Sequence, residues 1–354
     1  LIKKIQKKKS KVEFLVTTTT LSSSKLIAKE SKNIKNLHHK FLPIDSLKLV
    51  KNFLDNWKPK LAIFVDSEIW PNFLFEIKKK KVPLVLINGR ITKKTFNRWL
   101  FFSTFAKKIF NTFDLCFASS AESKKSLEYL RGKKVKYFGN LKFSSNYKNL
   151  LLDKKNIKVL NNYKTWCAAS IHEGEELFCL LTHIEVKKLQ KNLLTIIIPR
   201  HTVKSKIIKK QSEKLNLNVQ VINEGEKIKK NLDVLVVNSF GVSAKYFNYC
   251  KNIFIGKSMI PSLSSVGGQN PIEAAKLGCK IYHGKYIYNF QEVYDFLRSN
   301  QICSEVTDVN QFKNVLLRDF DDTKKINKKT IKKLNIYGNE ILNKTLNELK
   351  KFLK

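Results

Sequence analysis

Arginine and acidic residues are scarce in this chain, and that scarcity is the first constraint on its function. Of the 68 basic residues only six are arginine, so lysine carries almost all of the positive charge. Asp and Glu together number 29, which leaves a formal net charge of +39 at pH 7. A field of this sign attracts polyanions. Because 43% of the residues are hydrophobic, the chain still builds cores and is not a disordered polycation.

Nucleic-acid-binding motifs are missing despite the charge. The lysines are spread along the whole chain, and the sequence contains no zinc-finger spacing, RNP motif or basic zipper. We therefore expect no nucleic-acid partner. Charge alone leaves one alternative open, a basic protein that binds nucleic acid or a membrane surface without catalysing a reaction.

Cysteine pairs and metal-binding patterns are missing too. The six cysteines stand far apart with no Cys-x-x-Cys pair, which predicts free and mostly buried thiols. The segment from His172 to Glu176 begins like the zinc motif His-Glu-x-x-His, but Glu176 occupies the place of the second His ligand. We therefore expect neither a metal nor a cofactor.

Long apolar runs are absent, and so is a conventional start. No run of 18 or more apolar residues occurs, so the sequence predicts no membrane-spanning helix. The opening residues LIKKIQKKKS lack the apolar core of a signal peptide. The chain begins at Leu1, and its one methionine is Met259. We therefore expect the natural N-terminus to lie upstream of residue 1.

What the sequence does contain is a regular alternation of short apolar runs and amphipathic stretches. Buried runs separated by helices favour α/β domains with parallel sheets covered on both faces. The predicted strands lie at 12–16, 61–65, 82–87, 115–118, 135–139, 165–170, 194–199, 219–222, 234–237, 252–256 and 280–284. The clearest predicted helices lie at 45–57, 92–110, 121–131, 174–190 and 202–215.

A polar stretch near 144–163 separates these elements into two sets. The two sets predict two Rossmann-like domains that face each other, at 1–150 and 160–322, followed by a Lys-rich helical tail at 323–354. Ligands of such sheets bind beyond the carboxyl ends of the strands. Functional residues should therefore follow the apolar runs.

The strongest local motif is VGGQNPIEAAKLG at 266–278. Asn270 can cap a helix with Glu273 three residues later, which is an ordinary capping box. The same residues also suit a nucleotide, because amides at a helix start face phosphate and a carboxylate binds ribose hydroxyls. The doubled glycine at 267–268 favours the nucleotide, since capping does not require it.

A rare arginine marks a second motif. Arg200 and His201 directly follow the apolar run LTIIIP. A guanidinium binds phosphate with two parallel hydrogen bonds, whereas lysine offers a point charge. A structural pair between Arg200 and a carboxylate is the alternative. Arg90, which follows another predicted strand, supports the same interpretation less strongly.

Carboxylates and a lysine follow strands of the first domain. Asp66 and Glu68 stand in VDSEIWPN, where they can serve acid–base chemistry or cap the helix that begins near Pro71. Lys142 follows a strand and a short turn in FGNLKF. One lysine carries little weight in so lysine-rich a chain.

Together and in order, these motifs resemble the family of 3-deoxy-D-manno-octulosonic-acid (Kdo) transferases. The resemblance extends from about residue 12 to residue 293 through LVTTTTLSSS, HHKFLPID, VDSEIWPN, INGRIT, GNLKF, ASIHEGEE, PRH, VGGQNPIEAA and YNFQE. It implies a GT-B architecture, with a cleft between two Rossmann-like parallel-sheet domains. It also implies metal-independent transfer of Kdo from CMP-Kdo to a lipid A precursor, lipid IVA, in lipopolysaccharide biosynthesis.

The resemblance assigns partners and roles as well. The implied location is the cytoplasmic face of the bacterial inner membrane, on an anionic lipid surface. The residues implied to bind CMP are Pro199, Arg200, Phe240, Gly241, Val242, Asn270, Pro271, Ile272 and Glu273. Asp66 and Lys142 match catalytic positions that support the transition state.

The chain departs from the family pattern at several positions. Asp66 stands in place of a Glu, Phe240-Gly241-Val242 in place of Met-Gly-Glu, and Gly284-Lys285 in place of Gly-Pro. The family's catalytic Glu and its membrane-anchoring segment fall before residue 1, so we expect this chain to lack both. A different GT-B enzyme that uses a UDP-sugar, either a transferase or an epimerase, stays open as an alternative.

Overall fold

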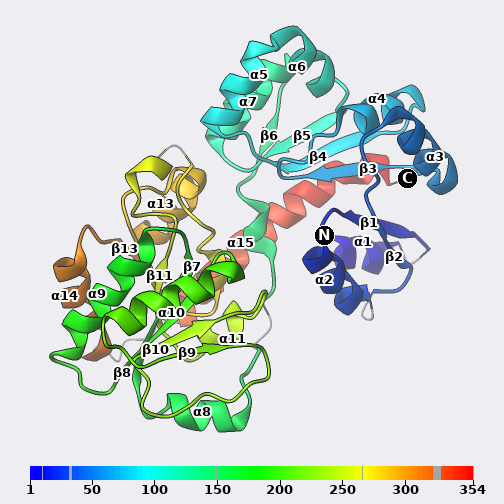
Figure 1. The fold of residues 1–354 in the computed structure, drawn as a ribbon. Helices are drawn as coiled ribbons and strands as arrows, with labels where there is room; N and C mark the ends of the chain where they lie inside the picture. The colour runs from blue at the N-terminus through cyan, green and yellow to red at the C-terminus, as the bar shows by residue number, and fades with distance from the viewer. Residues whose placement is uncertain (10, 32–33, 148–149, 265, 322–327, 354) are drawn as a thin grey trace. The chain divides into compact units, whose positions relative to one another are not determined.

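The chain divides into two compact α/β units. The computed structural model describes residues 1–9, 11–31, 34–147, 150–264, 266–321 and 328–353. Unit 1 comprises Leu1–Ser144 together with Gly338–Lys354, and unit 2 comprises Ser145–Tyr337. Both units consist of parallel strands with helices on their faces (Figure 1).

The described residues of unit 1 form six strands in two parallel sheets. The strands are β1 (Phe14–Thr18), β2 (Leu37–Phe41), β3 (Ala62–Val65), β4 (Leu84–Gly89), β5 (Leu115–Ala118) and β6 (Lys136–Tyr137). Their order is β1-β2 in one sheet and β3-β4-β5-β6 in the other, with Phe14 opposite Leu37 and Ala62 opposite Leu84. The helices are α1 (Ile2–Lys8), α2 (Leu21–Ser31), α3 (Leu47–Trp57), α4 (Pro71–Lys79), α5 (Lys93–Phe101), α6 (Ser103–Phe110) and α7 (Ala121–Arg131).

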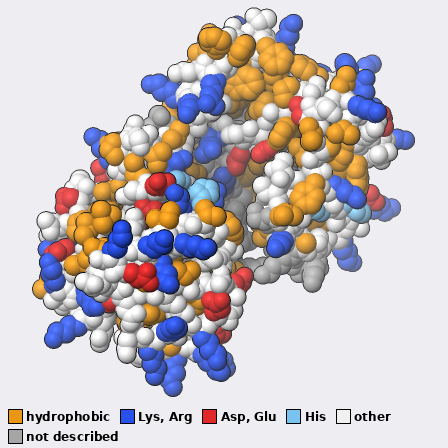
Figure 2. Space-filling view, in the orientation of Figure 1, with side chains coloured by type: hydrophobic (Ala, Val, Ile, Leu, Met, Phe, Trp, Pro, Cys, Tyr) orange, Lys and Arg blue, Asp and Glu red, His pale blue; other side chains and the backbone are white. Residues whose placement is uncertain are grey.

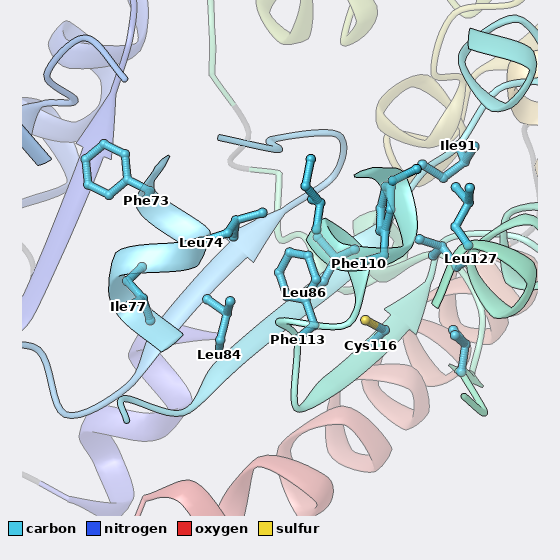
Figure 3. Close-up of a cluster of buried hydrophobic side chains, with 14 of the residues drawn as sticks. Phe73, Leu74, Ile77, Leu84, Leu86, Ile91, Phe110, Phe113, Cys116 and Leu127 are labelled. Carbon is cyan, nitrogen blue, oxygen red and sulfur yellow. The ribbon is translucent and has the colours of Figure 1, made fainter. Parts of the chain in front are cut away.

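The four-stranded sheet of unit 1 is buried on both faces, which explains the unbroken apolar run of β4. On one face, Leu84 and Leu86 pack with Phe73 and Leu74 of α4 and with residues of α6 and α7 (Figure 3). On the other face, the alternate residues of β4 pack against Leu349. Leu349 belongs to α15 (Lys328–Leu349), the last helix of the chain.

Unit 2 contains one seven-stranded parallel sheet. Its order is β13-β12-β11-β7-β8-β10-β9. The strands are β7 (Lys164–Ile171), β8 (Leu193–Pro199), β9 (Val219–Ile222), β10 (Val234–Val237), β11 (Asn252–Ile255), β12 (Lys280–His283) and β13 (Cys303–Glu305). The helices are α8 (Lys154–Leu160), α9 (Glu175–Lys187), α10 (Ser205–Lys214), α11 (Ser243–Phe247), α12 (Ile272–Lys276), α13 (Gln291–Ser299) and α14 (Val309–Asp321). Trp166 of β7 and Phe312 of α14 meet edge to face at 5.1 Å in its core.

Every predicted strand is present, and two further strands escaped prediction. Both of these, β2 and β13, lie at the edge of a sheet in the part of the chain that is described. The sequence of β2, LHHKF, is mostly exposed, and β13 is only Cys-Ser-Glu. Neither carries the apolar run of a central strand, because an edge strand needs less burial. The predicted helix at 92–110 is interrupted at Phe102, where α5 ends and α6 begins.

The end of the chain also differs from expectation. The sequence predicts a separate helical tail at 323–354, of which residues 323–327 and 354 lie outside the described part. In the structure, the residues from Gly338 onward belong to unit 1, since their apolar side chains fill the uncovered face of its sheet. The first division falls at Ser144, close to the predicted end of the first domain.

Candidate functional site

Asp66 and Lys142 are brought together at the carboxyl edge of the unit 1 sheet. Asp66 directly follows β3 in a left-handed conformation with φ 56°. Its backbone is fixed between Ile87 and Arg90, with N–H···O distances of 3.1 Å in both cases. Lys142 lies in the short 3-10 turn Leu141–Ser144, and its Nζ is 2.9 Å from Asp66 Oδ2. The structure thus pairs the two residues, while their catalytic role stays a prediction.

A third residue, Asn88, ties this pair to the sheet and was missed in the sequence. Its Nδ2 donates to Asp66 Oδ1 at 2.6 Å, and its Oδ1 accepts from the N–H of Leu141 at 2.8 Å. The side chain is buried, and its backbone is left-handed with φ 53°. Asn88 therefore holds the turn that carries Lys142 next to Asp66. The segment INGR contains Asn88, but Arg90 is its more distinctive residue, and no spacing in the sequence marks the role of Asn88.

The helix-capping alternative for Asp66 and Glu68 is wrong. The side chain that caps α4 is Asp45, which accepts the N–H groups of Asn72 and Phe73, both at 3.1 Å. Glu68 instead accepts the indole N–H of Trp70 at 2.8 Å. Asp66 is thus left to face Asn88 and Lys142.

Arg200 stands at the carboxyl end of β8, as predicted. Its N–H donates to the carbonyl of Ile171 at 3.0 Å, so the backbone is tied to the end of β7. The side chain is exposed, and no carboxylate of the described residues forms an ion pair with it. The alternative of a structural ion pair therefore finds no support. An exposed guanidinium with a fixed backbone is suited to bind an anion.

Two histidines lie beside Arg200, and sequence reasoning assigned no role to them. The rings of His172 and His201 are 6.2 Å apart, at the ends of the neighbouring strands β7 and β8. His172 Nδ1 is 3.0 Å from the carbonyl of Ser170. Burial lowers the pKa of His172 below its ordinary value, which favours the neutral imidazole. Glu173, next in sequence, pairs with Lys204 at 2.6 Å.

The doubled glycine at 267–268 has a structural reason that the sequence did not reveal. A Cβ on Gly267 would lie 2.4 Å from the carbonyl oxygen of Tyr286, and one on Gly268 would lie 3.0 Å from Ile287 Cα. Gly268 is also left-handed, with φ 88°. Close packing against the backbone of 286–287 thus requires these glycines without any phosphate. The doubled glycine therefore no longer favours a nucleotide over packing, and its contact with a nucleotide stays a prediction.

The residues that follow the glycines form a short helix start. Asn270 Oδ1 accepts the N–H of Ile272, the first residue of the five-residue α12, at 3.1 Å, while Pro271 and Ile272 are buried. Glu273 is half-buried, and burial raises the pKa of its carboxyl. Burial and the nearby charge of Glu273 raise the pKa of Tyr147 to about 12. Glu273 thus sits in a weakly solvated position where a hydroxyl donor would be favoured.

The remaining predicted segment, Phe240 to Val242, follows β10. Phe240 is 57% exposed, Gly241 is left-handed, and Val242 is buried at the start of α11. Pro199, Arg200 and this segment follow β8 and β10, which are neighbours in a parallel sheet. Since the carboxyl ends of parallel strands share one edge, these residues lie at the same edge of the unit 2 sheet, where ligands of open α/β sheets usually bind.

The described residues show no other conventional site. Within them, no group of three His, Cys, Asp or Glu side chains is placed to hold a metal ion. No described helix is both long and apolar enough to cross a membrane. All six cysteines are free and buried, as the sequence predicted.

Comparison with known proteins shows similarity to 3-deoxy-D-manno-octulosonic-acid transferases. Residues 1–145 match a family model described as 3-deoxy-D-manno-octulosonic-acid transferase (kdotransferase). The whole chain is 29% identical to the 3-deoxy-D-manno-octulosonic acid transferase of Rickettsia prowazekii, of which it spans 74%. It is 31% identical to the Rickettsia bellii enzyme over 80% of the chain and 66% of that protein.

The fold has known counterparts. UDP-GlcNAc 2-epimerase from Neisseria meningitidis, solved with UDP-GlcNAc bound, matches 99% of this chain and 94% of its own, with a TM-score of 0.62 and 15% identity. At that identity the likeness shows the fold alone. It confirms the predicted class, α/β with parallel sheets in two domains of the GT-B type.

Proposed function

Because the chain belongs to the Kdo transferase family, we propose that it transfers Kdo from CMP-Kdo to a lipid A precursor, lipid IVA. The observation that carries this proposal is the pairing of Asp66 with Lys142, two residues 76 positions apart that the family resemblance assigned to catalysis. Their meeting at 2.9 Å on the carboxyl edge of a parallel sheet is where an α/β enzyme places its chemistry.

Unit 2 is the proposed donor-binding unit. Arg200 supplies an exposed guanidinium for the phosphate of CMP. Asn270 and Glu273 lie at the start of α12, where Glu273 can accept hydrogen bonds from the ribose hydroxyls. Phe240 offers an exposed ring beside the same sheet edge for contact with the nucleotide. None of these interactions requires a metal.

The proposed role of Lys142 is electrostatic. Departure of CMP leaves negative charge on its phosphate, and a fixed cation that stabilises this charge lowers the barrier. Asp66 and Asn88 restrict the position of the ammonium group through the contacts described above. Holding the cation in place beforehand avoids reorganisation at the moment of reaction.

The proposed location is the cytoplasmic face of the bacterial inner membrane. The α5–α6 region of unit 1 carries three strongly exposed aromatic side chains, Phe101, Phe102 and Phe105, at 84%, 62% and 47% exposure. Lysines 93, 94, 107 and 108 stand in the same two helices. Figure 2 shows hydrophobic side chains gathered over this region with basic side chains beside them. Apolar rings with flanking lysines are typical of a surface that binds anionic lipid.

Ligand-dependent unfolding tests the donor assignment. A ligand that binds only the folded state raises the unfolding midpoint, so CMP should protect the protein and UDP should not. Protection by UDP alone would replace the Kdo donor with a UDP-sugar. Incubation with CMP-Kdo and lipid IVA then tests the reaction. Release of CMP and a heavier lipid product are the expected result for a protein that carries the family's catalytic Glu.

A further inference from the structure

Glu175 is a fully buried carboxylate that is absent from the residues assigned above. It occupies the first position of α9 and is 0% exposed. Four backbone N–H groups donate to it: those of His172 and Lys257 to Oε2 at 3.0 and 2.6 Å, and those of Ser258 and Met259 to Oε1 at 2.8 and 3.0 Å. Three consecutive N–H groups around an anion form the kind of concavity that elsewhere binds free anions.

The chain is shaped to admit this carboxylate. Gly256 directly follows β11, and a Cβ at that position would lie 2.6 Å from Glu175 Oε2 and 2.7 Å from the carbonyl oxygen of Ser170. Lys257 is left-handed with φ 61°, which turns its N–H toward the carboxylate. Both features strain or restrict the loop, and they persist because the four hydrogen bonds replace the water lost on burial.

Glu175 joins the two loops that carry the proposed CMP-binding residues. On one side, His172 bonds to Glu175, and the preceding residue Ile171 accepts the N–H of Arg200 at 3.0 Å. On the other side, the carbonyl of Lys257 accepts the N–H of Gly268 at 2.6 Å, two residues before Asn270. A single carboxylate thus lies between the arginine and the start of α12.

We propose that Glu175 is a positioning residue of the donor site: its carboxylate holds the loop after β11 against the loop after β7 and so sets the spacing between Arg200 and the segment 270–273. This inference rests on the proposed binding of CMP to unit 2. Glu175 acts through backbone groups and does not touch the nucleotide. Its contribution is to fix beforehand the groups that bind the donor, which reduces the entropy lost on binding.

A matched control separates positioning from general stabilisation. Asp319 is also buried, and it bonds to Lys280 Nζ at 2.7 Å and to the hydroxyl of Tyr282 at 2.6 Å. Lys280 begins β12, so this cluster lies at the amino end of the sheet, opposite the donor edge. Asp319→Asn should lower the stability of unit 2 without moving the donor residues.

The experiment compares Glu175→Gln with Asp319→Asn in the whole chain. The amide of Gln presents N–H groups to N–H donors, so the loop after β11 should loosen. We expect faster hydrogen exchange at the amides of 257–259 and CMP affinity lower by about tenfold or more. Asp319→Asn should bind CMP as the wild type does at a similar loss of stability.

Two outcomes decide the matter. CMP affinity at the wild-type level in a folded Glu175→Gln variant overturns the inference. Where that variant does not fold, Glu175→Asp keeps the charge but draws the carboxylate back from the N–H groups of 257–259 by one methylene, and unaltered CMP affinity there overturns the inference equally. If the wild type itself binds no CMP, the proposed donor is wrong, and hydrogen exchange at 257–259 alone decides whether Glu175 holds the loops.

Discussion

Lys142 Nζ lies 2.9 Å from Asp66 Oδ2, and a nearly identical ion pair elsewhere in unit 1 allows the two to be compared. Lys78 Nζ lies 2.7 Å from Asp114 Oδ1. The side chains of the first pair are 37% and 34% exposed, and those of the second 49% and 32%. Pairs so exposed contribute at most about 1 kcal/mol to stability. If loss of the Asp66–Lys142 pair lowers activity by more than this small change in stability explains, the pair has a role in function.

We predict that Lys142→Met lowers Kdo transfer on the order of 10²-fold, because the developing negative charge loses a fixed cation. Lys78→Met should leave turnover unchanged, and both variants should unfold at nearly the same denaturant concentration. Urea unfolding measures stability, and steady-state rates measure transfer in a protein that carries the family's catalytic Glu. Equal turnover in the two variants would remove Lys142 from catalysis.

Arg200→Lys should weaken CMP binding, because a point charge replaces two parallel N–H donors. The expected loss is about 1–3 kcal/mol, the range of a hydrogen bond to a charged group. Arg298→Lys is the control, since Arg298 is half-exposed in the same unit and bonds to Asp295 at 3.1 Å. Calorimetric titration with CMP distinguishes them. Arg200 does not bind the phosphate if the two variants have the same affinity.

Much of this fold could be predicted because central parallel strands are buried on both faces. The run LVLI in β4 is one example, with alternate residues packed on α4 and on Leu349. Edge strands such as β2 lack that signal. Residues from Gly338 onward pack on unit 1 through contacts that are distant in sequence. No local sequence pattern predicts such contacts.

The candidate site also contains residues that could be predicted from the sequence and residues that could not. Asp66, Lys142 and Arg200 are visible in the sequence because they follow strands. Asn88 and Glu175 are not, since their role depends on backbone N–H groups that every residue carries. A side chain that bonds to backbone groups has no partner of a particular residue type, so no spacing in the sequence predicts its role. Only the folded structure reveals that role.

The stability of unit 2 should depend on pH through His283, which is 0% exposed. Burial lowers its pKa below the ordinary value of 6.5, and the charge of Arg298 acts in the same direction. Above about pH 6.5 the imidazole is neutral in both states, so its contribution to folding is complete. As the pH falls below that value, His283 binds a proton in the unfolded state but not in the folded state, so the free energy of unfolding decreases.

His283→Asn should flatten this decline, because the amide can donate to the Gly284 carbonyl, which lies 2.8 Å from His283 Nδ1, and has no proton to take up. Urea unfolding at about pH 7.5 and about pH 5.5 measures the effect. The exposed His201, changed to Asn, is the control. An unchanged slope in His283→Asn would mean that other groups carry the acid sensitivity.

Replacing Phe101 and Phe102 with Ser should weaken binding to anionic vesicles, because both rings are exposed and able to enter the lipid interface. Binding by the wild type should fall as salt rises, since lysines contribute about 1 kcal/mol each near an anionic surface. Leu189→Ser is the control, because Leu189 is 69% exposed in the other unit. Vesicle sedimentation with and without anionic lipid measures both effects. Equal binding by all three proteins would place the contact elsewhere.

The last prediction concerns Gly267, for which sequence and structure suggest different roles. A Cβ there would lie 2.4 Å from a backbone oxygen, that of Tyr286, which a flexible side chain cannot relieve. Gly267→Ala should therefore destabilise the protein by about 1–3 kcal/mol, the range for forced overpacking. Gly241→Ala is the contrast, because a Cβ at Gly241 would have no atom within 4 Å and the substitution would be strained only by the left-handed φ of 73°.

The two interpretations of Gly267 differ in which quantity changes. If the glycine admits a phosphate, Gly267→Ala should lose CMP affinity while its unfolding stays close to that of the wild type. If it admits the backbone of 286–287, urea unfolding must shift well beyond the shift of Gly241→Ala, whatever happens to CMP. Because the clash involves main-chain atoms on both sides, relaxation requires the loop after β12 to move as a whole. We therefore expect the loss of stability, and a stable Gly267→Ala variant that fails to bind CMP would restore the phosphate interpretation.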